Sequence, residues 1–271
     1  MAPRPRKRFG QHWLRSEKAL AEIIKAANLQ PSDRVLEIGP GTGILTRRLL
    51  AESQAVVAIE IDRDLCKKLV KSFGNRENFL LLQGDILDLN IEQQLTNFPA
   101  FQQQNKVVAN IPYNITGPIL EKLLGKIAQP VIPAYDSIVL LIQKEVAERI
   151  CANPSSKTFG ALSVRVQYLA EPELICHVPA KAFEPPPKVD SAVVRLSPRN
   201  FPLAATNPKQ LETLVKVGFA KKRKMLRNNL KGLTDSETLS QLLEQLEINP
   251  QVRAENLSVR DWVNLSNKLK I

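Results

Sequence analysis

The chain has 271 residues, of which 44% are hydrophobic, and it carries a formal net charge of +11. This length and apolar content suffice for one large domain and a small second one. No apolar run approaches eighteen residues, which excludes a membrane-spanning helix, and the basic N-terminus lacks the apolar segment of a secretory signal. Three widely spaced cysteines, Cys66, Cys151 and Cys176, are typical of a reducing cytoplasm rather than of disulfides or a zinc site.

The first predicted elements resemble the start of a nucleotide-binding α/β unit. A helix over residues 16–27 precedes a buried strand at 35–38, and the glycine-rich segment 39–43 leads directly into a helix at 44–50. Glycines let the backbone pass close to a ligand. Their spacing is G-x-G-x-G, with Ile44 where the dinucleotide fingerprint requires glycine, and no Gly-Lys-Ser/Thr follows. The segment therefore argues against NAD, FAD and P-loop nucleotides.

Polar side chains follow the ends of the next three predicted strands. The strands cover residues 55–59, 79–83 and 107–109, and Glu60, Asp85 and Asn110 follow them. An acid at the position of Glu60 can accept two hydrogen bonds from ribose hydroxyls. Asp85 can accept from an adenine amino group, with Ile61 and Ile86 on the two faces of the ring. Because open α/β sheets bind ligands at the carboxyl ends of their strands, we expect a nucleoside-containing cofactor at this edge.

The tetrapeptide Asn110-Ile111-Pro112-Tyr113 is suited to hold a planar heterocycle with an exocyclic amino group. The Asn110 side-chain oxygen and the Ile111 carbonyl can both accept hydrogen bonds from an NH2 group. Pro112 fixes φ and turns the chain, and Tyr113 offers a ring face for stacking. The motif alone also fits a strand-end turn with a packing tyrosine.

Alternating strands and helices up to about residue 150 predict a parallel sheet. A fifth strand at 137–142 and a helix at 144–152 complete this part, while residues 162–169 are ambiguous by pattern. Two final strands are predicted at 173–178 and 189–196.

The last part of the chain is predicted to be helical. Residues 197–208 contain three prolines and are typical of a linker. Helices are predicted over 210–230, 236–246 and 258–269, the first carrying a basic face. We therefore expect a domain of residues 1–197 and a helical domain of residues 208–271.

The positive charge is confined to two segments. Residues 1–16 contain five Lys or Arg and no acid, and residues 214–233 contain seven and no acid. Without these twelve of the 38 basic residues, 26 remain against 27 acidic ones. Two basic segments on a nearly neutral chain are typical of a nucleic-acid footprint, although solvated charge runs are a common alternative.

At this point the sequence resembles the ribosomal RNA adenine N6-dimethyltransferases, which are class I S-adenosylmethionine-dependent methyltransferases acting on the 3′-terminal hairpin of small-subunit (16S) ribosomal RNA. The segments that carry the resemblance are residues 6–14, 37–41, 60–62, 110–114, 143–146, 183–191 and 223–228. The resemblance implies a Rossmann-like α/β fold with a mostly parallel seven-stranded sheet and a small all-helical C-terminal domain. It also favours a helix at 162–169.

The resemblance further implies the site residues. The cofactor S-adenosylmethionine would contact His12, Leu14, Gly39, Gly41, Glu60, Ile61, Asp85, Ile86 and Asn110. The target base would contact Asn110, Ile111, Pro112 and Tyr113, with Phe183 on its opposite face. RNA phosphates would contact Arg6, Lys7, Arg8, Lys221, Lys222, Arg223, Lys224 and Arg227.

Two positions depart from the family pattern, because His12 stands where Asn is common and Trp13 where Phe is usual. Both keep a planar polar or aromatic character, so we expect the N-terminal contact to survive. No metal is expected, since His12 and His177 are the only histidines and no Cys/His cluster is present.

The expected partner is 16S ribosomal RNA or a precursor of the small ribosomal subunit. A monomeric, cytoplasmic enzyme without membrane contact is expected. An adenine N6-methyltransferase acting on large-subunit ribosomal RNA or on DNA remains an alternative. A non-catalytic nucleic-acid-binding factor on the same fold is another, and a dehydrogenase is disfavoured by Ile44.

Overall fold

A computed structural model describes residues 5–6, 9–132, 135–221 and 223–269, and these divide into two compact units. Unit 1 comprises residues 1–123, 133–147 and 173–198, and unit 2 comprises residues 124–132, 148–172 and 199–271. The sequence predicts a division of the chain by role, into a catalytic domain of residues 1–197 and an RNA-binding domain of residues 208–271. This assignment of roles stays a prediction.

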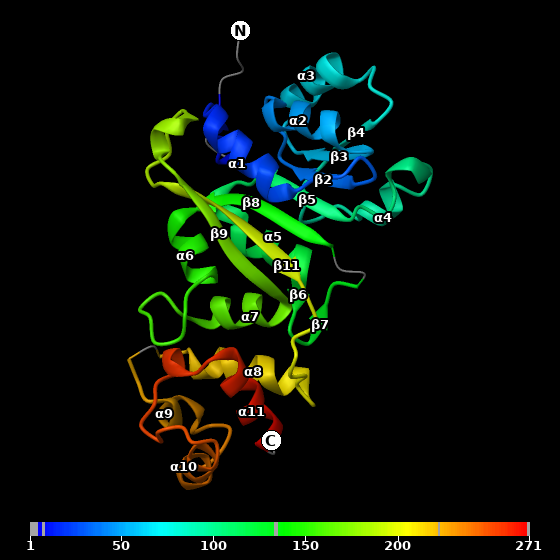
Figure 1. Cartoon of the computed structure of the whole chain (residues 1–271). Coiled ribbons are helices and arrows are strands. Elements are labelled where there is room, and N and C mark those ends of the chain that lie inside the picture. The colour runs from blue at the N-terminus through cyan, green and yellow to red at the C-terminus, as the bar shows by residue number, and fades with distance from the viewer. Residues whose placement is uncertain (1–4, 7–8, 133–134, 222, 270–271) are drawn as a thin grey trace. The chain divides into compact units, whose positions relative to one another are not determined.

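Unit 1 is built on a seven-stranded sheet with the strand order β4-β3-β2-β5-β8-β11-β9 (Figure 1). The strands are β2 (Arg34–Ile38), β3 (Ala55–Glu60), β4 (Phe79–Gln83), β5 (Lys106–Asn110), β8 (Ser137–Gln143), β9 (Ala170–Val178) and β11 (Ser191–Pro198). The pairs from β4 through β8 are parallel, whereas β11 runs antiparallel to β8. The predicted fold class, with its mostly parallel seven-stranded sheet, is confirmed.

The order of the strands brings the ends of β2, β3, β4 and β5 to one edge of the sheet. In the register, Ile38 pairs with Ile59 and Glu60 pairs with Gln83, so successive parallel strands end almost level. The chain then leaves each strand on the same side, toward the segments that follow Ile38, Glu60, Gln83 and Asn110. This edge is where parallel sheets place their ligand sites.

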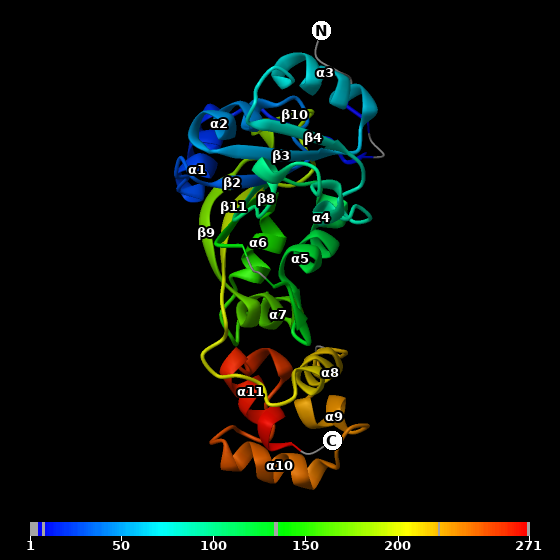
Figure 2. The same ribbon diagram turned by 90° about the vertical axis from the view of Figure 1, so that its right-hand side faces the viewer.

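Helices cover both faces of this sheet. They are α1 (Glu17–Ala27), α2 (Ile44–Glu52), α3 (Arg63–Phe73), α4 (Ile91–Gln94), α5 (Thr116–Leu124) and α6 (Lys144–Ile150). Figure 2 shows α1 and α5 on opposite sides of the sheet. The central strand β8 is therefore buried on both faces, which explains its unbroken apolar run Ile138–Ile142.

Local sequence determines where several of these helices begin. The Ser16 side chain accepts from the Ala19 backbone N–H at the start of α1, and the Asp62 side chain accepts from the Asp64 N–H at the start of α3. One isolated extended pair completes the unit, in which β1 (Trp13–Leu14) runs antiparallel to β10 (Phe183–Glu184). This pairing attaches the N-terminal arm to the body of unit 1.

Unit 2 is mainly helical and has its own core. Its helices are α7 (Ala161–Leu169), α8 (Pro208–Gly218), α9 (Leu226–Leu230), α10 (Ser236–Gln245) and α11 (Val259–Lys268), and it also contains the short pair β6 (Gly125–Lys126) and β7 (Gln129–Pro130). Trp262 is fully buried at its centre, and its ring lies 5.6 Å from that of Phe219. An added Cβ at Gly218 would come within 2.3 Å of Trp262, so glycine allows α8 to approach α11 closely.

The predicted continuous helix over residues 210–230 is wrong. It is two helices, α8 and α9, separated by residues 219–225. The Leu226 N–H donates to the Val252 carbonyl, Met225 bridges to Arg253, and the Asn229 side chain donates to the Gly218 and Lys221 carbonyls. These partners satisfy the backbone groups that a continuous helix would use. Lys221, Arg223 and Lys224 therefore lie in a loop rather than on a helix face.

Candidate functional site

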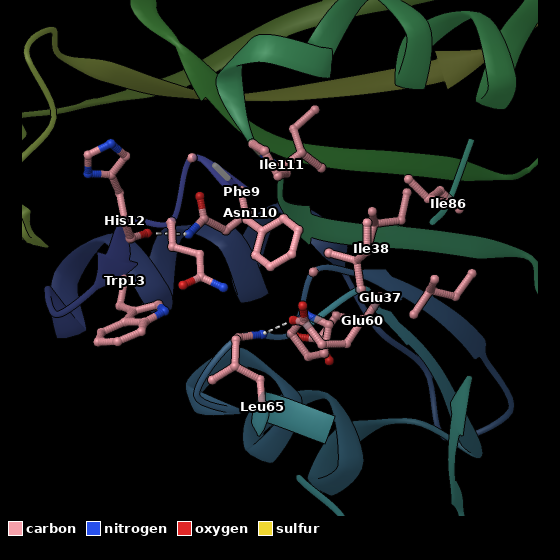
Figure 3. A pocket seen from close by; sticks show the side chains of 18 of the residues that line it. Phe9, His12, Trp13, Glu37, Ile38, Glu60, Leu65, Ile86, Asn110 and Ile111 are labelled. Carbon is pink, nitrogen blue, oxygen red and sulfur yellow. Dashed lines mark hydrogen bonds between the residues drawn. The ribbon is translucent and has the colours of Figure 1, made fainter. Parts of the chain in front are cut away.

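A cavity of about 310 Å³ lies within unit 1 at the carboxyl edge of the sheet (Figure 3). Its wall is formed by the N-terminal arm from Phe9 to Leu14, the glycine-rich segment and the segments after β3, β4 and β5. Among the described lining residues, three are acids (Glu37, Glu60 and Asp85) and none is Lys or Arg. The cavity thus favours a cationic ligand and disfavours one that carries phosphates.

The Glu60 carboxylate is fixed by the backbone around it. Its Oε2 accepts from the Gly41 N–H at 3.1 Å and its Oε1 accepts from the Asp62 N–H at 2.9 Å. Gly41 has φ +59°, which is unfavourable for other residues. Each carboxylate oxygen retains acceptor capacity, so Glu60 can receive a diol such as that of ribose. Burial raises the pKa of Glu60.

The segment after β4 is organised around Asp85. Its Oδ1 accepts from the Leu87 N–H at 2.9 Å, and its carbonyl accepts from the Leu89 N–H. Lys122 of α5 holds this turn from outside, because its Nζ donates to the Leu87 and Leu89 carbonyls at 3.1 and 2.9 Å. Asp85 and the buried Ile86 are thereby presented to the cavity as a preformed turn.

The Asn110 side chain has its orientation fixed by the N-terminal arm. Its Nδ2 donates to the His12 backbone carbonyl at 3.3 Å, and Figure 3 shows this bond at the cavity. The amide's donor end is therefore engaged, and its Oδ1 remains an acceptor. This is the orientation needed to accept a hydrogen bond from an exocyclic amino group.

The Tyr113 ring is held in place by two neighbours. Its hydroxyl is 2.5 Å from the Ser191 Oγ, and its ring lies 5.9 Å from the His12 ring with an interplanar angle of 17°. His12 in turn is fixed by a 2.8 Å hydrogen bond between Nδ1 and the Pro185 carbonyl. Burial raises the pKa of Tyr113, so the phenol stays neutral around pH 7. Two parallel rings thus stand beside Asn110.

Glu37 is an acid that the sequence analysis did not assign to the site. It is only 1% exposed and lines the cavity next to Glu60 in Figure 3, and neither carboxylate oxygen makes a hydrogen bond of good geometry, although Thr46 lies close enough to interact with them. Burial raises its pKa to about 8; the negative charge of Glu60 adds to the rise, and Thr46 opposes it. A buried carboxyl without a partner is costly unless a ligand completes it.

The structure brings most of the predicted site residues together. The cavity is lined by His12, Leu14, Gly39, Gly41, Glu60, Ile61, Asp85, Ile86, Asn110, Ile111, Pro112 and Tyr113. Phe183 is absent from this lining. It is 4% exposed, pairs with Leu14 across β1 and β10, and packs in the core of unit 1. Its predicted contact with the target base stays a prediction that the geometry does not favour.

The predicted RNA-binding residues fall in different environments. Arg6 is engaged within the protein, since its guanidinium pairs with Asp62 at 3.0 Å and with Asp64. Lys221, Arg223 and Lys224 are exposed in the loop before α9, and Arg227 is half-buried within α9. The predictions for Lys7, Arg8 and Lys222 lie outside the described residues. These roles all remain predictions.

Several cavity residues were missed by the sequence analysis, namely Phe9, Gln11, Trp13, Glu37 and Leu65. A charged residue inside the apolar run Val35–Ile38 was the one signal that pointed to Glu37. In the part of the chain that the structure describes, no group of three potential metal ligands is present, and no helix is long and apolar enough to cross a bilayer.

Comparison with known proteins gives matches along nearly the whole chain. The family model described as "Ribosomal RNA adenine dimethylase" matches residues 3–270. A protein of Rippkaea orientalis named "Ribosomal RNA small subunit methyltransferase A" is 66% identical over 268 residues, covering 99% of this chain and 98% of that protein.

Two solved structures are similar in sequence and in fold. A dimethyladenosine transferase from Plasmodium falciparum superposes with a TM-score of 0.77 at 29% identity, covering 94% of this chain and 96% of that one. The 23S rRNA methyltransferase ErmE superposes with a TM-score of 0.73 at 26% identity, covering 93% and 97%.

Proposed function

Because the chain belongs to the ribosomal RNA adenine dimethylase family, we propose that it dimethylates ribosomal RNA. It transfers methyl groups from S-adenosylmethionine to N6 of two adjacent adenines in the 3′-terminal hairpin loop of 16S ribosomal RNA, and each becomes N6,N6-dimethyladenosine. The small-subunit target is supported by the name of the 66% identical relative. The proposed methyl transfer to an amino group is supported by the orientation of Asn110. Its Nδ2 is engaged by the His12 carbonyl, so its Oδ1 is available as an acceptor at the cavity that Tyr113 also lines.

The cavity fits S-adenosylmethionine on three grounds. Its acids and lack of Lys or Arg among the described lining residues suit a ligand with sulfonium and ammonium charges. Glu37 has unpartnered oxygens that such charges would satisfy. The Glu60 carboxylate is fixed in place and can accept hydrogen bonds from the ribose diol. Asp85 can accept from the adenine amino group, and Ile61 and Ile86 offer apolar contacts to the ring. His12, Leu14, Gly39 and Gly41 complete the proposed contacts.

The bound cofactor supplies an electrophilic methyl group on a positively charged sulfur. The task of the protein's own residues is to make adenine N6 a better nucleophile, since its lone pair is delocalised into the purine ring. The Asn110 Oδ1 and the Ile111 carbonyl accept the two N6 hydrogens, which favours a pyramidal nitrogen and stabilises the positive charge that develops on it. Pro112 sets the turn that aims this carbonyl.

Tyr113 positions the base rather than exchanging protons with it. Its hydroxyl is held by Ser191, so the ring presents a fixed face for stacking, with cation–π stabilisation as charge develops on the purine. The transfer needs no general base in the transition state, because the N6 proton can leave afterwards. Alignment of donor and acceptor supplies most of the rate gain, and well-oriented pairs save roughly 7–11 kcal/mol of barrier.

RNA recognition is proposed to depend on the basic loop of unit 2, which we define as Lys221, Arg223 and Lys224, together with Arg227 of α9. These side chains would neutralise phosphates, and binding would weaken as salt rises. Recognition of RNA shape and of unstacked loop bases would add specificity, since a target adenine must leave its stack to enter the cavity. The proposed substrate is 16S ribosomal RNA within a precursor of the small subunit, and the enzyme is proposed to act as a cytoplasmic monomer.

The function is tested by incubating the protein with methyl-labelled S-adenosylmethionine and small subunits whose hairpin adenines are unmodified. We expect label in two adjacent adenines of the 3′-terminal hairpin, and mass spectrometry of the digested RNA should show dimethyladenosine. Asn110→Ala serves as the inactive control. Parallel reactions contain large subunits and duplex DNA.

A second candidate is methylation of large-subunit ribosomal RNA, which the fold similarity to the 23S rRNA methyltransferase ErmE favours. Label in the large-subunit reaction, with none in the small subunit, would establish this alternative and refute the proposed substrate. Label in the DNA alone would do the same for a DNA enzyme. No transfer to any substrate, despite tight RNA binding, would indicate a non-catalytic factor.

A further inference from the structure

A single buried carboxylate connects the N-terminal arm to the strand that carries Glu60. Asp62 is 3% exposed and follows Glu60 by two residues. Its Oδ1 accepts from the Arg6 guanidinium at 3.0 Å, and its Oδ2 accepts from the Gln11 side-chain amide at 3.0 Å. The Arg6 N–H also donates to the Gln11 Oε1 at 2.7 Å, which ties the two arm residues to each other.

These contacts hold the part of the arm that forms the cavity wall. Gln11, His12 and Trp13 line the cavity, and the His12 carbonyl is the group that orients Asn110. Asp62 also belongs to the Glu60 network, since its backbone N–H donates to the Glu60 Oε1. Loss of the Asp62 side-chain contacts would therefore loosen the segment around Arg6 and Gln11, which precedes β1, while leaving the pairing of β1 with β10 and the strand in place.

We propose that Asp62 is a positioning residue: its carboxylate anchors the arm through Arg6 and Gln11, and so keeps Gln11–Trp13 in the conformation that receives the methyl donor. This inference rests on the proposed function insofar as it names the ligand. It assigns Arg6 to donor binding instead of RNA phosphate binding, because both sides of its guanidinium already meet carboxylates.

The anchor is tested with two variants that break the same ion pair from opposite ends. Arg6→Gln removes the charge on the arm. Asp62→Asn removes the charge on the body but keeps an amide oxygen, which serves nearly as well as a carboxylate at the start of α3. Arg48→Gln is the matched control, since it breaks an exposed ion pair with Glu17 that lies outside the cavity lining.

The first measurement is calorimetry of S-adenosylmethionine binding without RNA. We expect Kd to rise about tenfold, which corresponds to about 1.4 kcal/mol, in each single variant. The double variant should be no worse than either single one, because both changes remove one interaction. Arg48→Gln should bind the donor as the wild type does.

The second measurement needs no cofactor. Trp13 is 7% exposed and Trp262 is fully buried in unit 2, so any gain in acrylamide quenching reports on Trp13 and hence on the arm. Quenching should increase in Arg6→Gln and Asp62→Asn but not in Arg48→Gln. Unchanged quenching and donor affinity in Arg6→Gln would overturn the proposal, and a lower salt slope of RNA binding would then return Arg6 to the phosphate contacts. A wild type that fails to bind the donor would refute the proposed function, while the quenching experiment would still test the anchor.

Discussion

Glu37 should make the ligand-free protein less stable as the pH rises, and Glu37→Gln should remove this dependence. The folded-state pKa of Glu37 is about 8, against 4.5 for the unperturbed group. The folded protein therefore binds one more proton than the unfolded chain between these values, so the stabilisation is full below pH 4.5 and is lost as pH rises through 8. At about 1.4 kcal/mol per pKa unit, the whole range corresponds to about 5 kcal/mol. Between pH 5 and pH 7 the loss is roughly 2–3 kcal/mol.

The assay is urea unfolding of wild type and Glu37→Gln at pH 5, 6, 7, 8 and 9. The stability of the variant relative to wild type should increase by roughly 2–3 kcal/mol from pH 5 to pH 7 and level off above pH 8. Equal denaturant slopes for the two proteins would confirm that the difference is one of stability. Glu52→Gln, which changes an exposed acid at the end of α2, is the control and should show no such trend. A difference independent of pH would refute the assignment of a shifted pKa to Glu37.

Three further predictions concern catalysis and binding. Asn110→Ala should lower kcat/KM for RNA methylation by roughly 10²–10³-fold, as loss of a transition-state hydrogen bond does, while RNA affinity in a filter-binding assay stays within twofold. Combined Lys221→Ala and Arg223→Ala should weaken RNA binding and reduce the salt slope by roughly one to two units; an unchanged slope would place the RNA surface elsewhere. Lys122→Met should raise KM for the donor several-fold at nearly constant kcat, because the turn after Asp85 loses the hydrogen bonds from Lys122 to the Leu87 and Leu89 carbonyls. Lys122→Arg, which keeps a donor there, should bring KM back close to the wild-type value.

The sheet and its ligand edge could be predicted from the sequence because their signals are local. Short apolar runs such as Ala55–Ile59 and Phe79–Leu82, each followed by a polar residue and separated from the next by a helical segment, are typical of buried parallel strands. The glycine-rich segment and the side chains of Glu60, Asp85 and Asn110 therefore fell at the right edge. The start of α1 is likewise set locally, because the Ser16 hydroxyl accepts from the backbone N–H of Ala19, three positions later.

Features that depend on distant partners were missed. The break between α8 and α9 depends on Val252, which lies 26 positions after Leu226 and competes for its backbone N–H. The ion pair of Arg6 with Asp62 was not predicted, because the two residues lie 56 positions apart in the chain. Phe183 could not be assigned from its place beside a proline-rich loop, because whether a ring faces a cavity or a core depends on the pairing of β10 with β1.

The distribution of charge explains how one small protein can handle a cationic donor and a polyanionic acceptor. Glu60 and Asp85 give the described cavity wall a negative potential, which attracts sulfonium and ammonium groups and repels phosphates, and Glu37 adds to it once a bound cation favours its ionised form. The basic loop of unit 2 has the opposite preference. An adenine base is uncharged, so it can enter an acidic cavity that its own backbone phosphates cannot enter.

Transfer of the methyl group removes the positive charge from sulfur, and the same acids then hold the thioether product less strongly than the donor. We therefore expect the acidic cavity to favour exchange of spent cofactor for fresh donor.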